Sequence, residues 1–138
     1  MLRLPAEVRD AIVAHARRDH PNEACGVVAG PAGQDRPVRV IEMLNEAASP
    51  TFYRFDSMEQ LKVWNAMDDA GEEPVIIYHS HTATEAYPSR TDINLAMEPD
   101  AHYVLVSTAD PAVADLRSYR IVDGVVTEEP VLVEEGTP

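Results

Sequence analysis

The chain has 138 residues, 45% of them hydrophobic and 25% charged, values typical of one globular domain with its own core. It carries 11 lysines and arginines against 24 aspartates and glutamates, which gives a formal net charge of −13 at pH 7. So acidic a surface repels phosphate backbones and anionic membranes. The charge therefore argues against nucleic acid and membranes as partners and favours a protein with basic patches.

A single cysteine, Cys25, excludes an internal disulfide and a cysteine-rich zinc site. The first residues, MLRLPAEVRD, lack the apolar core of a signal peptide, and no apolar run approaches membrane-spanning length. We therefore expect a cytoplasmic protein. No internal repeat, long linker or low-complexity block divides the sequence. We expect residues 1–138 to form one domain, with residues 134–138 as a flexible acidic tail.

The N-terminal part of the chain predicts one helix followed by two strands. Apolar residues recur at helical spacing over residues 8–16, with Pro5 in the first turn of the helix and Pro21 beyond its end. The apolar run at residues 24–29 is closed by glycine and proline, which predicts a buried strand. Residues 38–41 predict a second strand.

A second helix is predicted after a short extended piece at residues 52–55. Asp56 or Ser57 can cap its N-terminus, Glu59 lies in capping-box register with Asp56, and Gly71 is a natural stop. One side of this helix is expected to contain Met58, Leu61, Trp64 and Asp68. The tryptophan is expected to anchor the helix in the core.

The second half of the chain predicts strands around one short helix. The helix is expected at residues 90–97, and residues 101–107 alternate as a strand. Strands at 116–122 and 125–133 flank an Asp-Gly pair, the strongest hairpin signal in the sequence. Helices and strands in this order fit a mixed sheet with helices packed against it, so we expect one α/β domain.

The stretch VIIYHSHTATEAYPSRTD, residues 75–92, carries the clearest chemical signal. His79 and His81 are two positions apart, so in an extended chain both imidazoles lie on one face while Ser80 points away. Asp92 can add a third ligand from a separate element. Three ligands of the N, N and O type leave the fourth tetrahedral position for water, as in catalytic zinc sites. The spacing predicts a metallohydrolase with one Zn²⁺ per chain.

Such a hydrolase also needs a proton carrier and an oxyanion donor. Glu23, at the start of the first predicted strand, is the candidate general base and acid, although taken alone it is an ordinary loop acid. Ser89 can donate its hydroxyl to the oxyanion. Ser89 and Asp92 also form an S-x-x-D capping box that opens a helix, and the two roles are compatible.

The remaining histidines and the cysteine are expected to be structural. His15 and His20 flank the end of the first helix and have no partner at ligand spacing. His102 lies within a predicted strand. Cys25 is expected to be a small core residue rather than a nucleophile, because no base accompanies it in the sequence.

Glu23 followed by H-x-H, seven residues, S, two residues and D resembles the JAMM (MPN-plus) zinc metalloproteases. That family cleaves peptide or isopeptide bonds at the C-termini of ubiquitin-like proteins. The resemblance implies a single JAMM/MPN-like domain with a mixed, largely antiparallel sheet flanked by helices. It implies catalytic roles for Glu23 and Ser89 and metal-ligand roles for His79, His81 and Asp92. One departure is Thr82, where many members have proline.

Other stretches resemble one subgroup of that family, the actinobacterial Mec-type enzymes. These stretches include AHARRDHPNEACGVVAGP, SPTFYRFDS and PDAHYVLVST. The resemblance implies a substrate in which cysteine has been added to the C-terminal diglycine of a β-grasp sulfur-carrier protein. Hydrolysis of that last peptide bond releases L-cysteine, as in cysteine biosynthesis, and regenerates the carrier ending in Gly-Gly.

The sequence leaves two alternatives open: a broader JAMM isopeptidase acting on ubiquitin-like conjugates, and a metal-free scaffold module of the same fold. Such scaffolds usually lose the metal ligands, and none is lost here. We expect the carrier tail to be held by strand addition beside the catalytic strand, with residues 82–87 as the rim of the groove. Arg90 is a candidate partner for the α-carboxylate of the terminal cysteine, or a solvated helix arginine.

Overall fold

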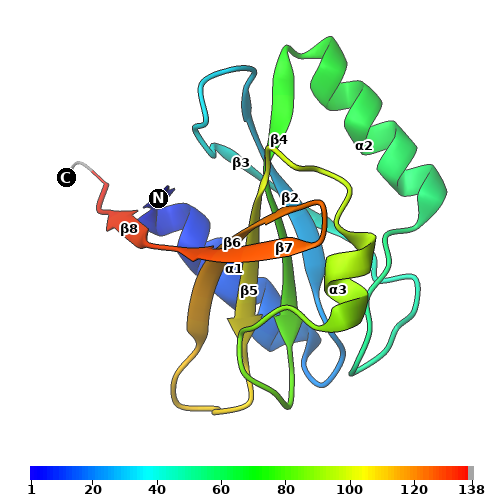
Figure 1. The fold of residues 1–138 in the computed structure, drawn as a ribbon, viewed down its shortest axis with the longest axis vertical. Helices are drawn as coiled ribbons and strands as arrows, with labels where there is room; N and C mark the ends of the chain where they lie inside the picture. Colours follow the sequence, from blue (N-terminus) through cyan, green and yellow to red (C-terminus); the bar gives the residue numbers. More distant parts are fainter. Residues whose placement is uncertain (137–138) are drawn as a thin grey trace.

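The computed structural model describes residues 1–136 and places six strands in one sheet, with helices on both of its faces (Figure 1). The strand order is β3-β2-β4-β5-β6-β7, and β4 and β5 are the only parallel neighbours in this described sheet. Its strands are β2 (Cys25–Pro31), β3 (Arg39–Met43), β4 (Glu72–His81), β5 (His102–Ser107), β6 (Asp115–Val122) and β7 (Val125–Glu129). The predicted α/β class with a mixed, largely antiparallel sheet is confirmed.

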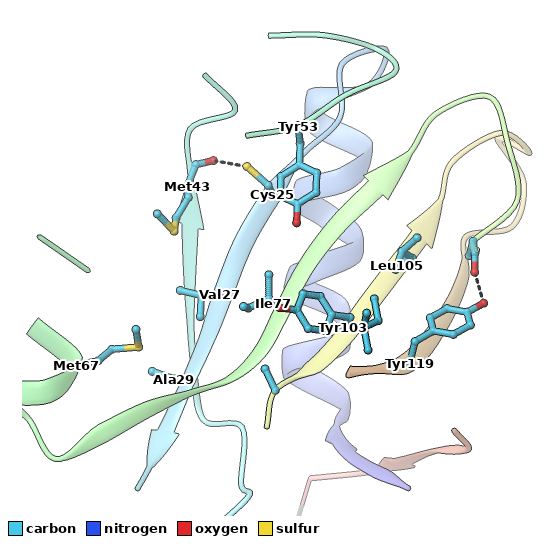
Figure 2. Close-up of a cluster of buried hydrophobic side chains, with 13 residues drawn as sticks. Cys25, Val27, Ala29, Met43, Tyr53, Met67, Ile77, Tyr103, Leu105 and Tyr119 are labelled. Atoms are coloured by element: carbon cyan, nitrogen blue, oxygen red, sulfur yellow. Dashed lines mark hydrogen bonds between the residues drawn. The ribbon is translucent and has the colours of Figure 1, made fainter. Parts of the chain in front are cut away.

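Each face of the sheet packs against its own helices. The helices are α1 (Ala6–Asp19), α2 (Ser57–Asp69) and α3 (Arg90–Leu95). Side chains alternate along a strand, so Val28 and Ile76 share a core with α1 while Val27 and Ile77 share the opposite core with α2 and α3 (Figures 1 and 2). Within residues 1–136 no helix is both long and apolar enough to cross a membrane.

Strand β4 is paired along both edges close to its C-terminal end. On one side Cys25 of β2 pairs with His79, and on the other side Ser107 of β5 pairs with His81. The N–H of Thr108 donates to the carbonyl of His81 at 2.9 Å, which extends the parallel pairing by one more bond. The strand that carries the H-x-H motif is therefore fixed in register from both sides.

A second, two-stranded sheet joins the chain ends and was not predicted. In it, β1 (Leu2–Pro5) pairs in parallel with β8 (Val131–Glu134). The sequence predicts one strand over residues 125–133, but Pro130 separates β7 from β8. Proline has no N–H to donate, and its carbonyl accepts a hydrogen bond from the N–H of Leu2 at 2.9 Å. The chain therefore leaves the main sheet at this residue.

Several predicted boundaries shift by one or a few residues. Pro5 is the N-cap of α1 and the last residue of β1, rather than part of the first helical turn. Helix α3 ends at Leu95 instead of Met97. Glu134, the first residue of the predicted tail, is the last residue of β8, and residues 137–138 lie outside the described residues.

Helix α2 has the predicted N-cap but a different buried side. The side chain of Asp56 accepts the N–H of Glu59, whereas the Glu59 carboxylate accepts the N–H of Leu44 instead of closing a capping box. Met58 and Leu61, predicted on one side of the helix with Trp64, are exposed. The side that packs on the sheet contains Val63, Trp64 and Met67. Packing against β4 decides which side of the helix faces the sheet, and helix propensity alone does not specify that side.

His102 is buried at the centre of an ion network at the end of β5, as expected for a structural histidine. Its ring nitrogens lie 2.6 Å from a carboxylate oxygen of Glu129 and 2.7 Å from one of Asp35. Ser118 donates to Glu129 at 2.8 Å, and the amino group of Met1 lies 3.1 Å from the same carboxylate. Burial alone would raise the pKa of Glu129, but the bonds from His102 and Ser118 lower it to about 2.

This network predicts a pH-dependent contribution to stability. A carboxyl whose pKa is depressed stabilises the fold above its unfolded pKa, and that contribution disappears as the pH falls through the folded pKa. We expect Glu129 to contribute about 1–3 kcal/mol at neutral pH, lost between about pH 5 and pH 2. Urea unfolding across this range should show Glu129→Gln less stable at pH 7 and less sensitive to acid. Glu128→Gln, at the exposed neighbouring residue, is the control, and identical acid sensitivity of wild type and Glu129→Gln would contradict the expectation.

Candidate metal centre

Three side chains from two elements converge at the C-terminal end of β4. The Nε2 atoms of His79 and His81 are 3.3 Å apart, and Oδ2 of Asp92, in the first turn of α3, lies 3.1 and 3.0 Å from them. All three residues are buried. Within residues 1–136, they are the one group of at least three histidine, cysteine, aspartate or glutamate residues whose ligand atoms are close enough to share a metal ion.

The hydrogen bonds around the imidazoles direct lone pairs toward this centre. Nδ1 of His81 lies 2.9 Å from the carbonyl oxygen of Glu85, which can only accept, so Nδ1 carries the proton and Nε2 of the neutral ring is bare. Burial lowers the pKa of His79 and keeps that ring neutral too. Burial also opposes charge on His81, but the bonds to Asp92 and Glu85 prevail and raise its pKa. A cation between the rings and the carboxylate is therefore favoured.

The spacing of the three atoms fits a metal ion. A tetrahedral ion with bonds of about 2.0–2.1 Å holds its ligand atoms about 3.3 Å apart. The observed separations of 3.0, 3.1 and 3.3 Å are close to that value. A proton on an imidazole can join these atoms by a hydrogen bond, and when both Nε2 atoms are bare a metal ion among them removes the repulsion between the lone pairs and the carboxylate. With three protein ligands, such an ion would keep one coordination position open.

Asp92 is oriented by a complete capping box at the start of α3. Oγ of Ser89 accepts the N–H of Asp92 at 3.1 Å, and Oδ2 of Asp92 accepts the N–H of Ser89 at 2.8 Å. Burial would raise the pKa of Asp92, but the bonds from His79, His81 and the Ser89 N–H hold it well below its usual range. The predicted helix cap is confirmed, and it fixes the carboxylate that faces the imidazoles.

Glu23 lies two residues before the start of β2, the strand next to β4. Ala24 is bound to Ser80 twice: its carbonyl accepts the N–H of Ser80 at 3.0 Å, and its N–H donates to Oγ of Ser80 at 2.8 Å. Ser80, the middle residue of the H-x-H motif, thus points away from the candidate metal centre and binds the chain just before β2 to β4. With Cys25 paired to His79, this register puts Glu23 opposite the second histidine.

The Glu23 side chain is buried on the same sheet face as the two imidazoles, with 4% of the residue exposed. Burial raises the pKa of its carboxyl to about 7, opposed by the charge of His81 and reinforced by that of Asp92. A carboxyl with this pKa can both take up and release a proton near neutral pH. The structure thus brings together all five residues that the sequence motif singled out.

Two further residues of this region were not among the predicted site residues. The ring of Tyr53 stacks on that of His79, with ring centroids 4.2 Å apart and an interplanar angle of 22°. Nδ1 of His79 is buried and has no hydrogen-bond partner in the described part of the chain, so this packing holds the ring. Asn45 donates a hydrogen bond to the carbonyl of Glu23. Neither residue lies at a spacing from the H-x-H motif that would mark it.

The loop at residues 82–88 is attached to remote parts of the chain. The hydroxyl of Thr82 donates to the carbonyl of Pro50 at 2.8 Å, a bond that a proline at this position would not make. The hydroxyl of Tyr119 donates to the carbonyl of Ala86 at 2.5 Å (Figure 2). These bonds hold the predicted rim of the groove against β6 and against the loop before α2.

The structure corrects one expectation and confirms another. The predicted strand addition beside β4 is wrong, because β5 occupies one edge as far as His81 and β2 occupies the other as far as His79, with a further bond at Ser80. Cys25 is buried, its Sγ lies 3.8 Å from the carbonyl of Met43, and burial raises the pKa of its thiol to about 12 (Figure 2). The thiol is therefore a core group and not a nucleophile. Arg90 is exposed at the first residue of α3.

A family model described as prokaryotic homologs of the JAB domain matches residues 5–122. The chain belongs to this JAB family. Among its relatives is the CysO-cysteine peptidase of Mycobacterium tuberculosis, 72% identical over 135 residues, which cover 98% of this chain and 92% of that protein. The desampylase of Haloferax volcanii is 36% identical over 111 residues, 77% of this chain and 80% of that protein.

A solved structure supports the same architecture. The solution structure of a Desulfitobacterium hafniense protein superimposes with a TM-score of 0.85 at 34% identity, covering 99% of this chain and 94% of that one. The match spans both sheets and all three described helices of this JAB-family chain. The candidate metal centre therefore lies within a fold that is shared along almost its whole length.

Proposed function

We propose that this protein is a zinc-dependent JAMM-type peptidase. Its substrate is a β-grasp, ubiquitin-like sulfur-carrier protein with cysteine added to its C-terminal Gly-Gly, and its products are L-cysteine and the free carrier. The observation that carries the proposal is the near-full-length 72% identity to a CysO-cysteine peptidase. The proposal is also supported by three candidate metal ligands, His79, His81 and Asp92, near a carboxyl group, that of Glu23, with a raised pKa. We also propose a cytoplasmic location, consistent with the free thiol of Cys25.

The proposed metal is one Zn²⁺ per chain, held by Nε2 of His79, Nε2 of His81 and Oδ2 of Asp92. Two imidazoles and one carboxylate form a donor set that suits zinc, and the site keeps a net positive charge when the ion is bound. When bound, zinc acts as a Lewis acid that lowers the pKa of water and polarises the scissile carbonyl. The protein side chains around it then move protons and orient the substrate.

Glu23 is proposed as the proton carrier. Its carboxylate takes the proton of the attacking water and returns it to the α-amine of the departing cysteine. A pKa of about 7 is close to the operating pH, where uptake and release are both accessible. Because the residue is buried on the face of the metal ligands, the carboxylate is close to the reaction and shielded from bulk water.

Ser89 is proposed as the oxyanion donor in addition to its role as helix cap. Its Oγ accepts the N–H of Asp92, and its own proton remains available to donate. A hydroxyl directed at the carbonyl oxygen stabilises the negative charge that develops there. Arg90, the next residue, is proposed as the partner for the α-carboxylate of the terminal cysteine.

The carrier tail needs a path that does not compete with β2 or β5. The N–H of Arg54 donates to Oδ1 of Asn45, and its carbonyl accepts the N–H of Glu46. Neighbouring residues of an extended segment direct their backbone groups to opposite edges. The backbone N–H and C=O groups of Tyr53 and Phe55 therefore point to the other edge of this segment. That edge borders a cavity of about 280 Å³, whose lining includes Tyr53, Phe55, Leu95, Met97 and Tyr103. We propose that the extended tail pairs with this edge and that the exposed Leu95 and Met97 contact the apolar surface of the carrier.

One second function is favoured by a specific observation. The desampylase relative from Haloferax volcanii, at 36% identity, supports a broader isopeptidase that acts on ubiquitin-like conjugates. A metal-free scaffold is less consistent with the chain, because all three candidate ligands are present and converge.

Cleavage of defined carriers discriminates between these functions. Zinc-loaded protein should be given diglycine carriers that end in cysteine, in alanine, or in an isopeptide-linked lysine peptide, and the products should be weighed by mass spectrometry. We expect loss of one cysteine residue from the first carrier at a rate at least about tenfold above the others, a difference of about 1.4 kcal/mol in the barrier. Equal cleavage of all three would support the broader isopeptidase.

The control for this assay is a protein that binds zinc but lacks the proton carrier. Glu23→Gln is expected to keep one zinc per chain and to lose about 10²–10⁴-fold in turnover. Glu7→Gln, at an exposed residue of α1, should turn over like wild type. Wild-type turnover by Glu23→Gln would remove Glu23 from the mechanism.

Zinc affinity is expected to depend on pH through His81. Its raised pKa means that a proton competes for Nε2 as the pH falls, so affinity is highest where the ring is neutral. We expect a loss of about tenfold per pH unit below the pKa of that residue, measured by competition with a chromophoric chelator. Asp92→Asn keeps an acceptor for the Ser89 N–H but removes the charge, and it should bind at least about tenfold more weakly. Zinc affinity that does not change with pH would contradict this ligand set.

A further inference from the structure

Asn45 uses every hydrogen-bonding position of its side chain. Nδ2 donates to the carbonyl oxygens of Glu23 at 3.0 Å and Phe52 at 2.9 Å. Oδ1 accepts the N–H of Ala47 at 3.0 Å and the N–H of Arg54 at 3.1 Å. An amide has two N–H donors and two acceptor lone pairs, so all of its capacity is used in this one orientation. Asparagine therefore pairs all four of these backbone groups, whereas an ionised aspartate has no N–H to donate to the two carbonyl oxygens.

The first of these bonds fixes the peptide that carries Glu23. The N–H of Glu23 donates to the carbonyl of Ser49 at 2.9 Å, and the following N–H, of Ala24, donates to Oγ of Ser80. Asn45 completes this set by holding the carbonyl of Glu23. The backbone on both sides of the carboxylate is thus attached, on one side to the loop before α2 and on the other to the catalytic strand β4.

The other bonds of Asn45 fix the backbone around Tyr53. Phe52 and Arg54, the residues on either side of the tyrosine, are both held by the asparagine side chain. The ring of Tyr53 stacks on His79, whose Nδ1 has no hydrogen-bond partner within residues 1–136. One buried amide, 9% exposed by residue, therefore connects the segment of the proton carrier with the ring that packs against a candidate metal ligand.

We propose that Asn45 is a positioning residue of the reaction, which holds Glu23 and Tyr53 in register with β4. It acts through the backbone of Glu23 and has no direct contact with the candidate ligands in the bonds described. The proposal rests on the proposed function, because it assumes that Glu23 carries the proton. A displacement of about 1 Å at a reacting group costs about 10²-fold in rate, so the loss of this anchor should affect turnover more than substrate binding.

The first test replaces Asn45 with a residue of the same shape. Asn45→Asp sets a carboxylate oxygen against the carbonyls of Glu23 and Phe52, which that side chain cannot bond while ionised. We expect a folded protein with one zinc per chain, a kcat for the cysteine-tipped carrier about 100-fold below wild type, and a KM within about threefold of it. Asn65→Asp makes the same chemical change at an exposed residue of α2 and should leave both constants unchanged.

A double-mutant cycle separates positioning of Glu23 from a general structural defect. If Asn45 acts mainly through Glu23, then adding Asn45→Asp to Glu23→Gln should lower the single-turnover rate by a much smaller factor than it does in wild type, and the contact through Tyr53 accounts for the remainder. A loss by the same factor in both backgrounds would overturn the proposal, as would wild-type turnover by Asn45→Asp. Loss of zinc from Asn45→Asp would overturn it too, because the residue would then act on the metal centre.

A second variant covers the case in which aspartate prevents folding. Asn45→Ala removes the four bonds without placing a charge beside the carbonyls, and it is expected to show the same fall in kcat and the same smaller effect in the Glu23→Gln background. If neither variant folds, Asn45 is a folding residue and the proposal is wrong. Wild-type protein serves as the reference: if it fails to release cysteine, the proposed function fails, whereas active wild type with equally active Asn45 variants rejects Asn45 alone.

Discussion

The site depends on the pairing of β4 along both of its edges. Because β2 binds this strand up to Ser80 and β5 binds it up to His81, the two imidazoles cannot shift in register or rotate to the other face. The same pairing sets the position of Glu23, since Ala24 is bound to Ser80. Metal centres require ligands held within a few tenths of an ångström, and the centre of a sheet provides that rigidity. Only the third ligand, Asp92, comes from another element, and its own capping box orients it.

The sheet and the segments around it contribute different residues to this region. The sheet holds the two histidines and positions Glu23, while many residues around the cavity come from the segment before α2 and from the region at the end of α3. Loops can vary among relatives without disturbing the sheet, so one centre can serve carriers with different C-terminal groups. In this chain the loop before α2 is not independent of the centre. Asn45 donates a hydrogen bond to the carbonyl of Glu23, and the ring of Tyr53 stacks on that of His79.

Features encoded by local spacing were predictable from the sequence, and features made by distant pairing were not. The i, i+2 histidines, the S-x-x-D cap and the Asp-Gly hairpin are local, and the structure contains each of them. The β1–β8 pair joins opposite ends of the chain, and the occupied edges of β4 depend on the sheet order, so neither could be read from periodicity. Asn45 and Tyr53 act through contacts that no motif records. The roles of Glu23, Ser89, His79, His81 and Asp92 stay predictions, although the structure brings all five together.

The central claim is that two imidazoles and one carboxylate hold zinc beside Glu23. The most direct measurement is the X-ray absorption spectrum at the zinc edge of the zinc-loaded protein. The account predicts a first shell of nitrogen and oxygen only, at about 2.0–2.1 Å, with the outer-shell scattering of two imidazoles. A sulfur shell near about 2.3 Å, which Cys25 would have to supply, or a shell without imidazole scattering would contradict it.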